Sequence, residues 1–270
     1  YGSAPDGSVK VFSRGGSDIS GSVAAAALNA DAYENWTDVP GILMADPRIV
    51  DNPKAIARVT FSELRELSYM GADVLHQETV FPVRKKNIPL YIKDANNLNA
   101  PGTLIMEDFP PDPTEDGFKF ITGISGKKSY TIISINKSGI SDSIGYIKRV
   151  LDIVERYDIN IEHIPCSIDS FSLVIAADAA KDRIPLLIGE ISRECDPDSI
   201  KVTPDISIIA VVGRKMAYRP GVSGRLFKAL GDNNINIRMI EQGADEINIM
   251  VGVEDHNFEK AIRVLYHSYT

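Results

Sequence analysis

The chain has 270 residues, of which 44% are hydrophobic and 24% are charged, and it carries a net charge of -8. This length is enough for two or more domains with buried cores, and the composition is that of a globular protein. No segment approaches the roughly 18 apolar residues that a membrane-spanning helix requires. The negative charge argues against a nucleic-acid partner, which normally binds a basic face. We therefore favour small-molecule ligands.

Cysteine and histidine are sparse. The two cysteines, Cys166 and Cys195, occur in no metal-binding or redox spacing. This argues against a disulfide scaffold and favours a reducing compartment such as the cytoplasm. We expect both cysteines to be buried apolar residues. The four histidines also lack ligand spacing, so we interpret them as structural or solvated and predict no metal held by side chains.

The first hundred residues alternate between strand-like and helix-like patterns. Strands are predicted at residues 9–12, 88–93 and 103–106, and helices at 17–30 and 61–76. Such alternation indicates an α/β layer architecture.

The second of these helices has the clearest start signal. Thr60 is followed three residues later by Glu63, which is the spacing of a capping box. Leu64 and Leu67 begin an apolar face, so we predict a helix that packs against a core.

The stretch "FSRGGSDISGS", residues 12–22, allows two interpretations. Ser17 or Asp18 could simply cap the following helix, with the glycines forming the turn. Alternatively, the guanidinium of Arg14 and the backbone N–H groups of the helix start could hold an anion. A pair of glycines alone does not decide between them.

The stretch "WTDVPGILMADPR", residues 36–48, is by itself most simply two turns around a short strand, with Arg48 paired at the surface. After it, residues 95–117 are rich in Asn, Pro, Asp and Gly. They predict a linker, interrupted by the strand at 103–106.

Beyond the linker the sequence nearly repeats itself. Residues 130–175 and 206–251 share one order: apolar strand, polar loop with Gly, amphipathic helix, turn, Asn-Ile strand and apolar strand. Two copies of one βαββαβ unit are the simplest account. The first copy closes with a helix at 182–195 and a strand at 200–203. The second lacks a closing strand, and we expect "FKFITGIS", residues 118–125, to supply it. The first unit would then be inserted in the second.

Three ordered motifs and the paired units carry a family resemblance. The motifs are "SRGGSD", "NWTDVPGILMADPRIV" and "ELSYMGADVLH". With the repeats, they make the chain resemble the aspartate kinase family, whose regulatory modules are ACT domains. The resemblance implies an α/β fold: the C-terminal part of an amino-acid-kinase sandwich with its linker, followed by two ferredoxin-like ACT modules, the first inserted in the second. The implied bounds are 1–117 for the kinase part, 129–204 for the first module, and 118–128 with 205–270 for the second.

The same resemblance implies a function. Aspartate kinases use ATP and Mg2+ to phosphorylate the side-chain carboxylate of L-aspartate, the first step of lysine, threonine and methionine biosynthesis, under feedback inhibition. The family's N-terminal Lys-Phe-Gly-Gly motif does not occur in this sequence. We therefore expect a fragment whose kinase activity alone is negligible. The alternative is a catalytically silent regulatory subunit that binds an amino acid.

The resemblance also assigns roles to residues of the kinase part. Arg14 and Ser17 match positions that hold aspartate, and Asp18 matches one at the reacting end. Four residues match positions at the ATP site: Thr37, Asp38, Leu43 and Arg48. Asp73 departs from the family, where many members have Lys, and a carboxylate there would repel phosphate, so we leave it out of the site.

An effector site is predicted in the first unit. The backbone groups at the helix start near residue 145 suit a carboxylate, and Glu162 could meet an ammonium group, although alone it would be a solvated strand residue. By resemblance, the effector-contacting positions are Ile140, Ser143, Gly145, Tyr146, Ile147, Asn160, Ile161 and Glu162. The acidic Glu162 favours lysine over threonine as the effector.

The last expectation concerns assembly. The strands "INIEHI" and "FSLVI" of the first unit should be exposed edges, which invite pairing with another chain. Related aspartate kinases pair this unit with its copy. We therefore expect a homodimer built through residues 129–204, with lysine at or beside the interface.

Overall fold

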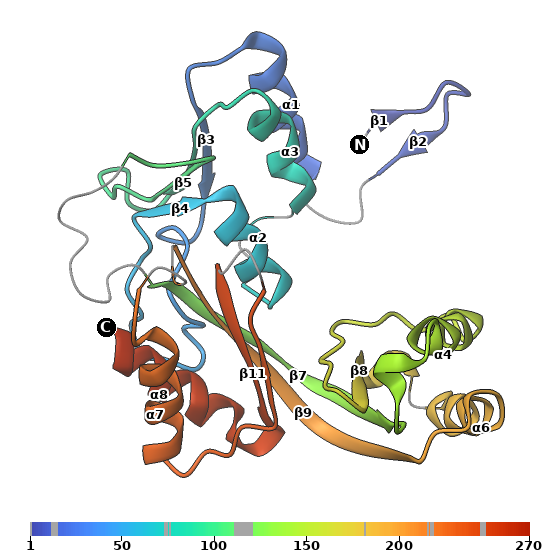
Figure 1. Cartoon of the computed structure of the whole chain (residues 1–270). Helices are drawn as coiled ribbons and strands as arrows, with labels where there is room; N and C mark the ends of the chain where they lie inside the picture. Colours follow the sequence, from blue (N-terminus) through green and yellow to red (C-terminus); the bar gives the residue numbers. More distant parts are fainter. Residues whose placement is uncertain are drawn as a thin grey trace.

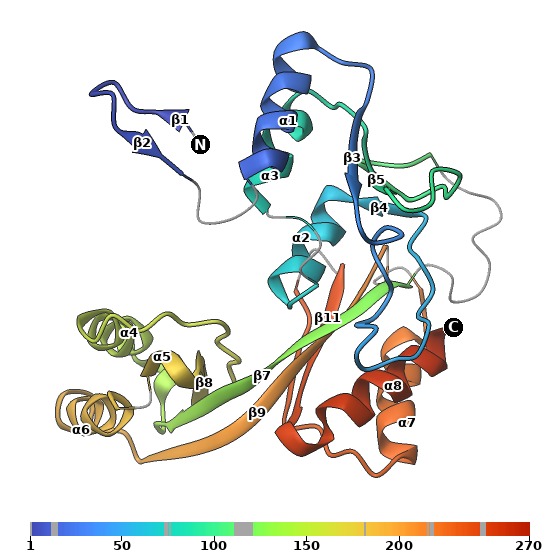
Figure 2. The ribbon, with the colours of Figure 1, turned by 180° about the vertical axis from the view of Figure 1, so that it is seen from behind.

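The computed structural model describes residues 2–11, 16–72, 75, 77–110, 121–180, 182–214, 216, 219–243 and 247–270. The chain forms an N-terminal part and a C-terminal part, which meet at the helix Phe61–Tyr69 and at the loop of residues 44–54 (Figure 1). A hairpin of two exposed strands, β1 (Gly2–Ser3) and β2 (Val9–Lys10), stands away from both parts (Figures 1 and 2). None of the described helices has the length and apolar character that crossing a bilayer would need.

The N-terminal part is built on a four-stranded sheet in the order β3-β5-β6-β4. β3 runs parallel to β5, and β4 runs parallel to β6, whereas β5 and β6 are antiparallel. The strands are β3 (Tyr33–Thr37), β4 (Arg58–Thr60), β5 (Leu90–Asp94) and β6 (Thr103–Met106). The α/β architecture predicted from the alternating patterns is confirmed.

Three helices accompany this sheet: α1 (Gly16–Leu28), α2 (Phe61–Tyr69) and α3 (Gln77–Lys85). The predicted capping box is present, because Thr60 Oγ1 accepts from the Glu63 amide and the Glu63 side chain accepts from the Thr60 amide. The prediction of one helix over 61–76 is wrong. α2 ends at Tyr69, and Gly71 has a φ of 100°, a left-handed conformation that only glycine adopts without strain and that ends helices.

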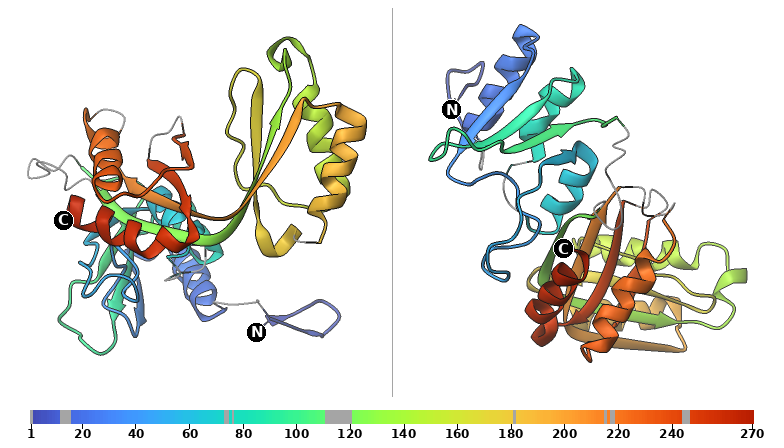
Figure 3. Two further views of the ribbon diagram at one scale, coloured as in Figure 1. Left: turned by 90° about the horizontal axis from the view of Figure 1, so that it is seen from below. Right: turned by 90° about the vertical axis from the view of Figure 1, so that its left-hand side faces the viewer.

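The C-terminal part is a five-stranded sheet in the order β10-β11-β9-β7-β8. Its strands are β7 (Ile121–Asn136), β8 (Ser170–Ala176), β9 (Ser199–Gly213), β10 (Met239–Glu241) and β11 (Asn248–Glu254). β7 and β9 are long antiparallel partners that run through both sequence repeats, and the repeats lie at opposite ends of this pair (Figures 1 and 3).

The sequence predicted separate short strands where β9 is continuous. Pro204, which cannot donate to a sheet, lies where the register between β7 and β9 shifts: Tyr130 pairs with Ile206, and Ile132 pairs with Thr203. A bulge tolerates proline, so the strand passes through it. Residues 118–120 of the predicted strand "FKFITGIS" lie outside the described residues, and 121–125 begin β7.

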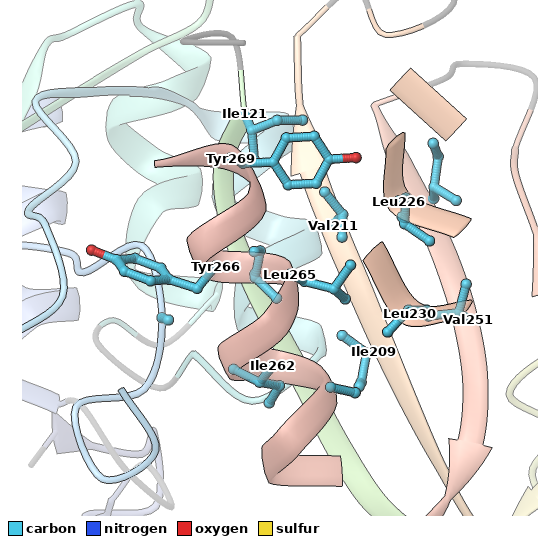
Figure 4. Packing of buried hydrophobic residues seen from close by; sticks show 14 of the residues in the cluster. Ile121, Ile209, Val211, Leu226, Leu230, Val251, Ile262, Leu265, Tyr266 and Tyr269 are labelled. Atoms are coloured by element: carbon cyan, nitrogen blue, oxygen red, sulfur yellow. The ribbon is translucent and has the colours of Figure 1, made fainter. Parts of the chain in front are cut away.

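Each repeat covers its sheet with two helices. The first repeat contributes α4 (Tyr146–Arg156) and α6 (Ile184–Cys195), and the second contributes α7 (Val222–Asp232) and α8 (Phe258–Tyr269). Short helical turns complete the chain: η1 (Ile140–Asp142), α5 (Ala177–Ala180) and η3 (Asp255–Asn257). Figure 4 shows the apolar side chains of α7, α8 and the sheet packed together in the second repeat.

The two repeats share details of backbone geometry. Gly145 and Gly221 are the N-caps of α4 and α7 and have φ values of 79° and 90°. At the other ends of these helices, Asp158 and Asn234 have φ values of 51° and 55°. Left-handed residues at equivalent places support the interpretation of two copies of one unit.

The sheet of the second repeat is buried on both faces. Along β9, Ile209 and Val211 pack against α7 and α8, whereas Ile208 and Ala210 pack against α2 and the N-terminal part. This alternation follows from the two-residue period of a strand. The N-terminal part therefore packs on the face of this sheet that is opposite to α7 and α8.

The outer edge of the first repeat differs from the prediction. Residues 160–166 form no regular strand but make two isolated bridges to β8, His163 with Val174 and Cys166 with Phe171. β8 is thereby covered on both sides, so the expectation that "FSLVI" is an exposed edge is wrong. Cys195 is buried as predicted, but Cys166 is exposed.

Candidate functional site

The start of α1 places two predicted catalytic residues side by side. α1 begins at Gly16, so Ser17 and Asp18 lie in its first turn and the interpretation of either as its cap is wrong. Ser17 Oγ donates to Asp18 Oδ1 over 3.3 Å. Arg14, the third predicted residue here, lies outside the described residues.

A close approach fixes this helix start against β3. The Tyr33 hydroxyl donates to the Asp18 carbonyl oxygen over 3.2 Å. Burial, and then the charge of Asp18, raise the pKa of Tyr33. A Cβ atom on Gly21 would lie 2.6 Å from the Tyr33 oxygen, so only glycine lets the ring pack here. The Tyr33 ring, packed against Gly21, thus positions α1 against β3.

Two of the predicted ATP-binding residues follow β3. Thr37 ends the strand, and its hydroxyl donates to Asp38 Oδ1 over 3.2 Å. The Thr37 carbonyl oxygen accepts from the Ala95 amide over 2.7 Å, which holds the strand end beside the turn after β5. Asp38 is exposed, so its carboxylate faces solvent.

The other two predicted ATP-binding residues, Leu43 and Arg48, line a cavity of about 400 Å³. The cavity lies between residues 39–49, the end of α2, β7 and α8, and Thr37 and Asp38 are not among its described lining residues. The Arg48 guanidinium contacts Asp46 with Nε–Oδ1 and Nη2–Oδ2 distances of 3.0 and 2.7 Å. This bonding lowers the pKa of Asp46. The four residues are therefore divided between two places.

The predicted effector loop forms the entrance to α4. Gly145 leaves the helix start with no side-chain cap, so the first-turn amides that follow Tyr146 can meet an anion. The Tyr146 amide donates to the Ser143 carbonyl oxygen over 3.2 Å, and the Ser143 amide to that of Ile140 over 3.1 Å. These two hydrogen bonds fix the backbone conformation of the loop.

Two side chains of this loop point into the protein. The Tyr146 ring is buried edge-on to Phe171, and Ile140 is buried in the same core. The Tyr146 hydroxyl is buried with no hydrogen-bond partner among the described residues. The Tyr146 hydroxyl is therefore not available to a ligand at the surface, and the Tyr146 amide is already bonded to Ser143.

The edge segment presents Glu162 to the N-terminal part. Ile161 packs into the core of the first repeat, whereas Glu162 accepts hydrogen bonds from the Tyr69 hydroxyl and, over 3.4 Å, from Asn160 Nδ2. Burial, followed by the hydrogen bond to Glu162, raises the pKa of Tyr69. Burial and the charge of Glu162 raise the pKa of Tyr130 to about 12. Within the described chain, no hydrogen bond joins Glu162 to the loop at 143–147.

Sequence reasoning missed a buried polar junction on α2. The Glu63 carboxylate is fully buried and lies 3.4 Å from Arg214 Nε, while Thr122 donates to it from β7. One turn later, Glu66 accepts from Asn248 Nδ2 of β11 over 2.6 Å. The capping-box spacing accounted for Glu63, and no local signal shows that the same side chain joins two domains.

Comparison with known proteins agrees with this architecture. Residues 1–94 match the amino acid kinase family, and residues 209–269 match the ACT domain. The chain is 37% identical over 272 residues to aspartokinase 3 of Bacillus subtilis, covering all of this chain and 58% of that protein. It belongs to the aspartate kinase family. The chain thus spans a little over half the length of this curated relative.

Solved structures of aspartate kinases are similar over the whole chain. The enzyme from Clostridium acetobutylicum aligns with a TM-score of 0.91 at 48% identity, covering 100% of this chain and 62% of the other. E. coli aspartokinase III in complex with aspartate and ADP (R-state) aligns with a TM-score of 0.78 at 28% identity, covering 98% and 58%. The same enzyme in complex with lysine and aspartate (T-state) gives 0.75, also at 28% identity, covering 99% and 58%.

Proposed function

We propose that the chain is part of an ATP-dependent aspartate kinase that is inhibited by lysine. The reaction transfers the γ-phosphoryl group of ATP to the side-chain carboxylate of L-aspartate, which begins lysine, threonine and methionine biosynthesis. The observation that carries the proposal is the alignment of the whole chain with the Clostridium acetobutylicum aspartate kinase at a TM-score of 0.91. The E. coli relative crystallised with aspartate, ADP and lysine supports the choice of ligands.

The resemblance to the family assigns a role to each candidate residue. Arg14 and Ser17 would hold aspartate, with Asp18 at the reacting end. Thr37, Asp38 and Leu43 would contact the nucleotide. The proposed enzyme also uses Mg2+, which screens the phosphates, and among these residues Asp18 and the exposed Asp38 carry carboxylates, which are ligands that suit this ion.

Arg48 would supply a fixed positive charge to the transferring group. Its guanidinium is bonded to Asp46, yet its side chain is 85% exposed. An exposed ion pair of this kind is weak, so a phosphate can replace the carboxylate at little cost. Arg48 is therefore available to a nucleotide despite its partner.

The domain limits given by the sequence belong to this proposal. The kinase part would cover residues 1–117, the first ACT module 129–204, and the second module 118–128 with 205–270. The pairing of β7 residues 121–127 with the second half of β9 supports the insertion of the first module in the second. The two modules would then share their two longest strands. A displacement of one module would therefore also shift the strands of the other.

We assign lysine to the first module. The open amides at the start of α4 suit the carboxylate of an amino acid, and the half-buried Glu162 suits an ammonium group.

The chain would form a homodimer through residues 129–204. Ile144 and Ile168, which are 99% and 76% exposed, support a further apolar contact on this module. Light scattering that shows a monomer with and without lysine would count against the dimer.

An activity assay tests the enzyme assignment. The chain spans 58% of the Bacillus subtilis relative, so we expect no measurable aspartyl phosphate, trapped as the hydroxamate, from the 270 residues alone. A chimera that adds the N-terminal portion of that relative should be active. In the chimera, Arg14→Ala should raise the KM for aspartate about tenfold or more, because it removes a charge-assisted pair.

The matched control is Arg193→Ala, which removes a largely exposed guanidinium from α6 and should leave this KM unchanged. An inactive chimera that is nonetheless folded would contradict the kinase assignment. An unchanged KM in Arg14→Ala would contradict the role of that residue alone.

A further inference from the structure

Helix α2 carries polar side chains at three positions spaced three residues apart, and each of them contacts the C-terminal part. Glu63 meets Thr122 and Arg214, and Glu66 meets Asn248, all of which belong to the second repeat. Tyr69 meets Glu162, which belongs to the first repeat. The last turn of α2 is thus the place where the N-terminal part touches the predicted effector segment.

The contact of Tyr69 differs from the other two in its exposure. Glu63 is fully buried and Asn248 is 8% exposed, whereas Tyr69 is 41% exposed. Glu162 is half-buried. A solute can therefore reach the Glu162 carboxylate without opening the core.

The surroundings of this carboxylate suit a cation. Its Oε2 atom accepts from the Tyr69 hydroxyl and its Oε1 atom accepts from Asn160. The ring of Tyr69 already attracts an ammonium group, since Lys127 Nζ lies 5.1 Å from the ring centroid. An ionised carboxylate only accepts hydrogen bonds, so an ammonium group and the phenol hydroxyl are both donors that this carboxylate can bind.

We propose that Tyr69 is a residue of the effector site that the kinase part contributes, and that the ammonium group of lysine binds Glu162 by displacing the Tyr69 hydroxyl. The inference rests on the proposed function, because it takes lysine as the ligand. Binding then removes the described hydrogen bond between α2 and the first repeat. The contacts of Glu63 and Glu66 with the second repeat stay in place, so the kinase part keeps its polar contacts with the second repeat and loses this one with the first.

Calorimetric titration of the 270-residue chain with lysine tests the displacement. Tyr69→Phe keeps the ring but removes the competing hydrogen bond, so it should lower the Kd for lysine about threefold to tenfold. The control is Tyr91→Phe on β5, whose hydroxyl has no hydrogen-bond partner among the described residues and whose ring also lies near a lysine, Lys93. This variant should bind lysine as the parent chain does.

The outcomes separate the two proposals. If the parent chain binds lysine and Tyr69→Phe binds it equally or more weakly, the displacement is wrong and the effector assignment stands. If the parent chain does not bind lysine at all, the effector assignment fails and the inference fails with it.

A second measurement follows the tyrosine directly. In a chain labelled with 13C at the tyrosine ζ-carbon, the Tyr69 signal is the one that is missing in Tyr69→Phe. Lysine should move this signal to the position of a water-exposed phenol and leave the Tyr91 signal in place. A Tyr69 signal that stays fixed while calorimetry shows binding would overturn the proposal, and circular dichroism would establish that each variant is folded.

Discussion

The two repeats of the C-terminal part share a backbone design and differ at one equivalent position on their edges. Glu162 follows Gly145 at the same spacing at which Arg238 follows Gly221. Glu162 offers a carboxylate to Tyr69 and solvent, whereas Arg238 is a cation already paired with Glu254 over 3.1 Å. Under the proposed function, only the first repeat can accept the ammonium group of an amino acid.

The two repeats also differ in how much of each is buried against the rest of the chain. The second repeat buries one face of its sheet under α7 and α8 and the other under α2 and the N-terminal part. The first repeat has its own core under α4 and α6, and only a few of its residues, such as Tyr130 and Val174, reach the shared core. One copy of the duplicated unit can thus attach the N-terminal part, and the other copy remains able to change its position when a ligand binds.

The buried junction of α2 with the second repeat gives the largest expected effect. Glu63→Ala should lower the free energy of unfolding by about 3 to 5 kcal/mol, because it removes the capping box and leaves the Arg214 charge without this partner. Urea unfolding followed by circular dichroism measures the change. Glu155→Ala on the exposed surface of α4 is the matched control and should change the value by less than about 0.5 kcal/mol. Equal effects in both variants would show that the junction does not hold the parts together.

A pair of core substitutions sharpens the contrast in attachment. Leu187 on α6 and Leu226 on α7 are both fully buried, so each change to Ala should cost about 2 to 5 kcal/mol. Hydrogen exchange should then separate them, because α2 packs on the sheet of the second repeat. Leu226→Ala should speed exchange of the α2 amides, and Leu187→Ala should speed exchange within the first repeat only. Faster exchange in α2 for both variants would mean that the two repeats open as one unit.

Much of this architecture could be predicted from the sequence, because its signals are local. The capping box at Thr60 and Glu63 and the apolar periodicity of α4 and α7 depend on residues within one or two turns. The duplicated order of elements was equally visible. The sequence also pointed to the residues of the candidate sites, although only through resemblance to a family.

What could not be predicted depends on contacts between distant residues. Pro204 predicts the end of a strand, yet β9 continues past it because a bulge against β7 accommodates the proline. Tyr69 and Glu162 are 93 positions apart, and neither residue has a local pattern that marks the other as its partner. The early end of α2 was missed because Gly71 can also occur inside a helix pattern, and only the fold shows its positive φ.

Matched substitutions at the edges test the difference in ligand recognition. Glu162→Gln should raise the Kd for lysine about tenfold to a hundredfold, because a charge-assisted hydrogen bond is lost. Arg238→Gln at the equivalent position should leave this Kd unchanged, since the guanidinium is occupied by Glu254. Calorimetry on the 270-residue chain measures both. If Arg238→Gln weakens binding as much as Glu162→Gln does, the second repeat also takes the ligand and the contrast fails.

The smallest expected effect comes from the two helix-capping glycines, and it separates folding from binding. A Cβ atom on Gly145 or Gly221 would meet nothing within 4 Å, so the cost of an alanine is the strain of its positive φ alone, about 1 to 2 kcal/mol in each case. Urea unfolding should therefore show equal losses. Lysine binding should not be equal, because the proposal places the ligand carboxylate at the amides that follow Gly145. Gly145→Ala should raise the Kd several-fold and Gly221→Ala should leave it unchanged. Equal Kd values in the two variants would move the carboxylate away from the start of α4.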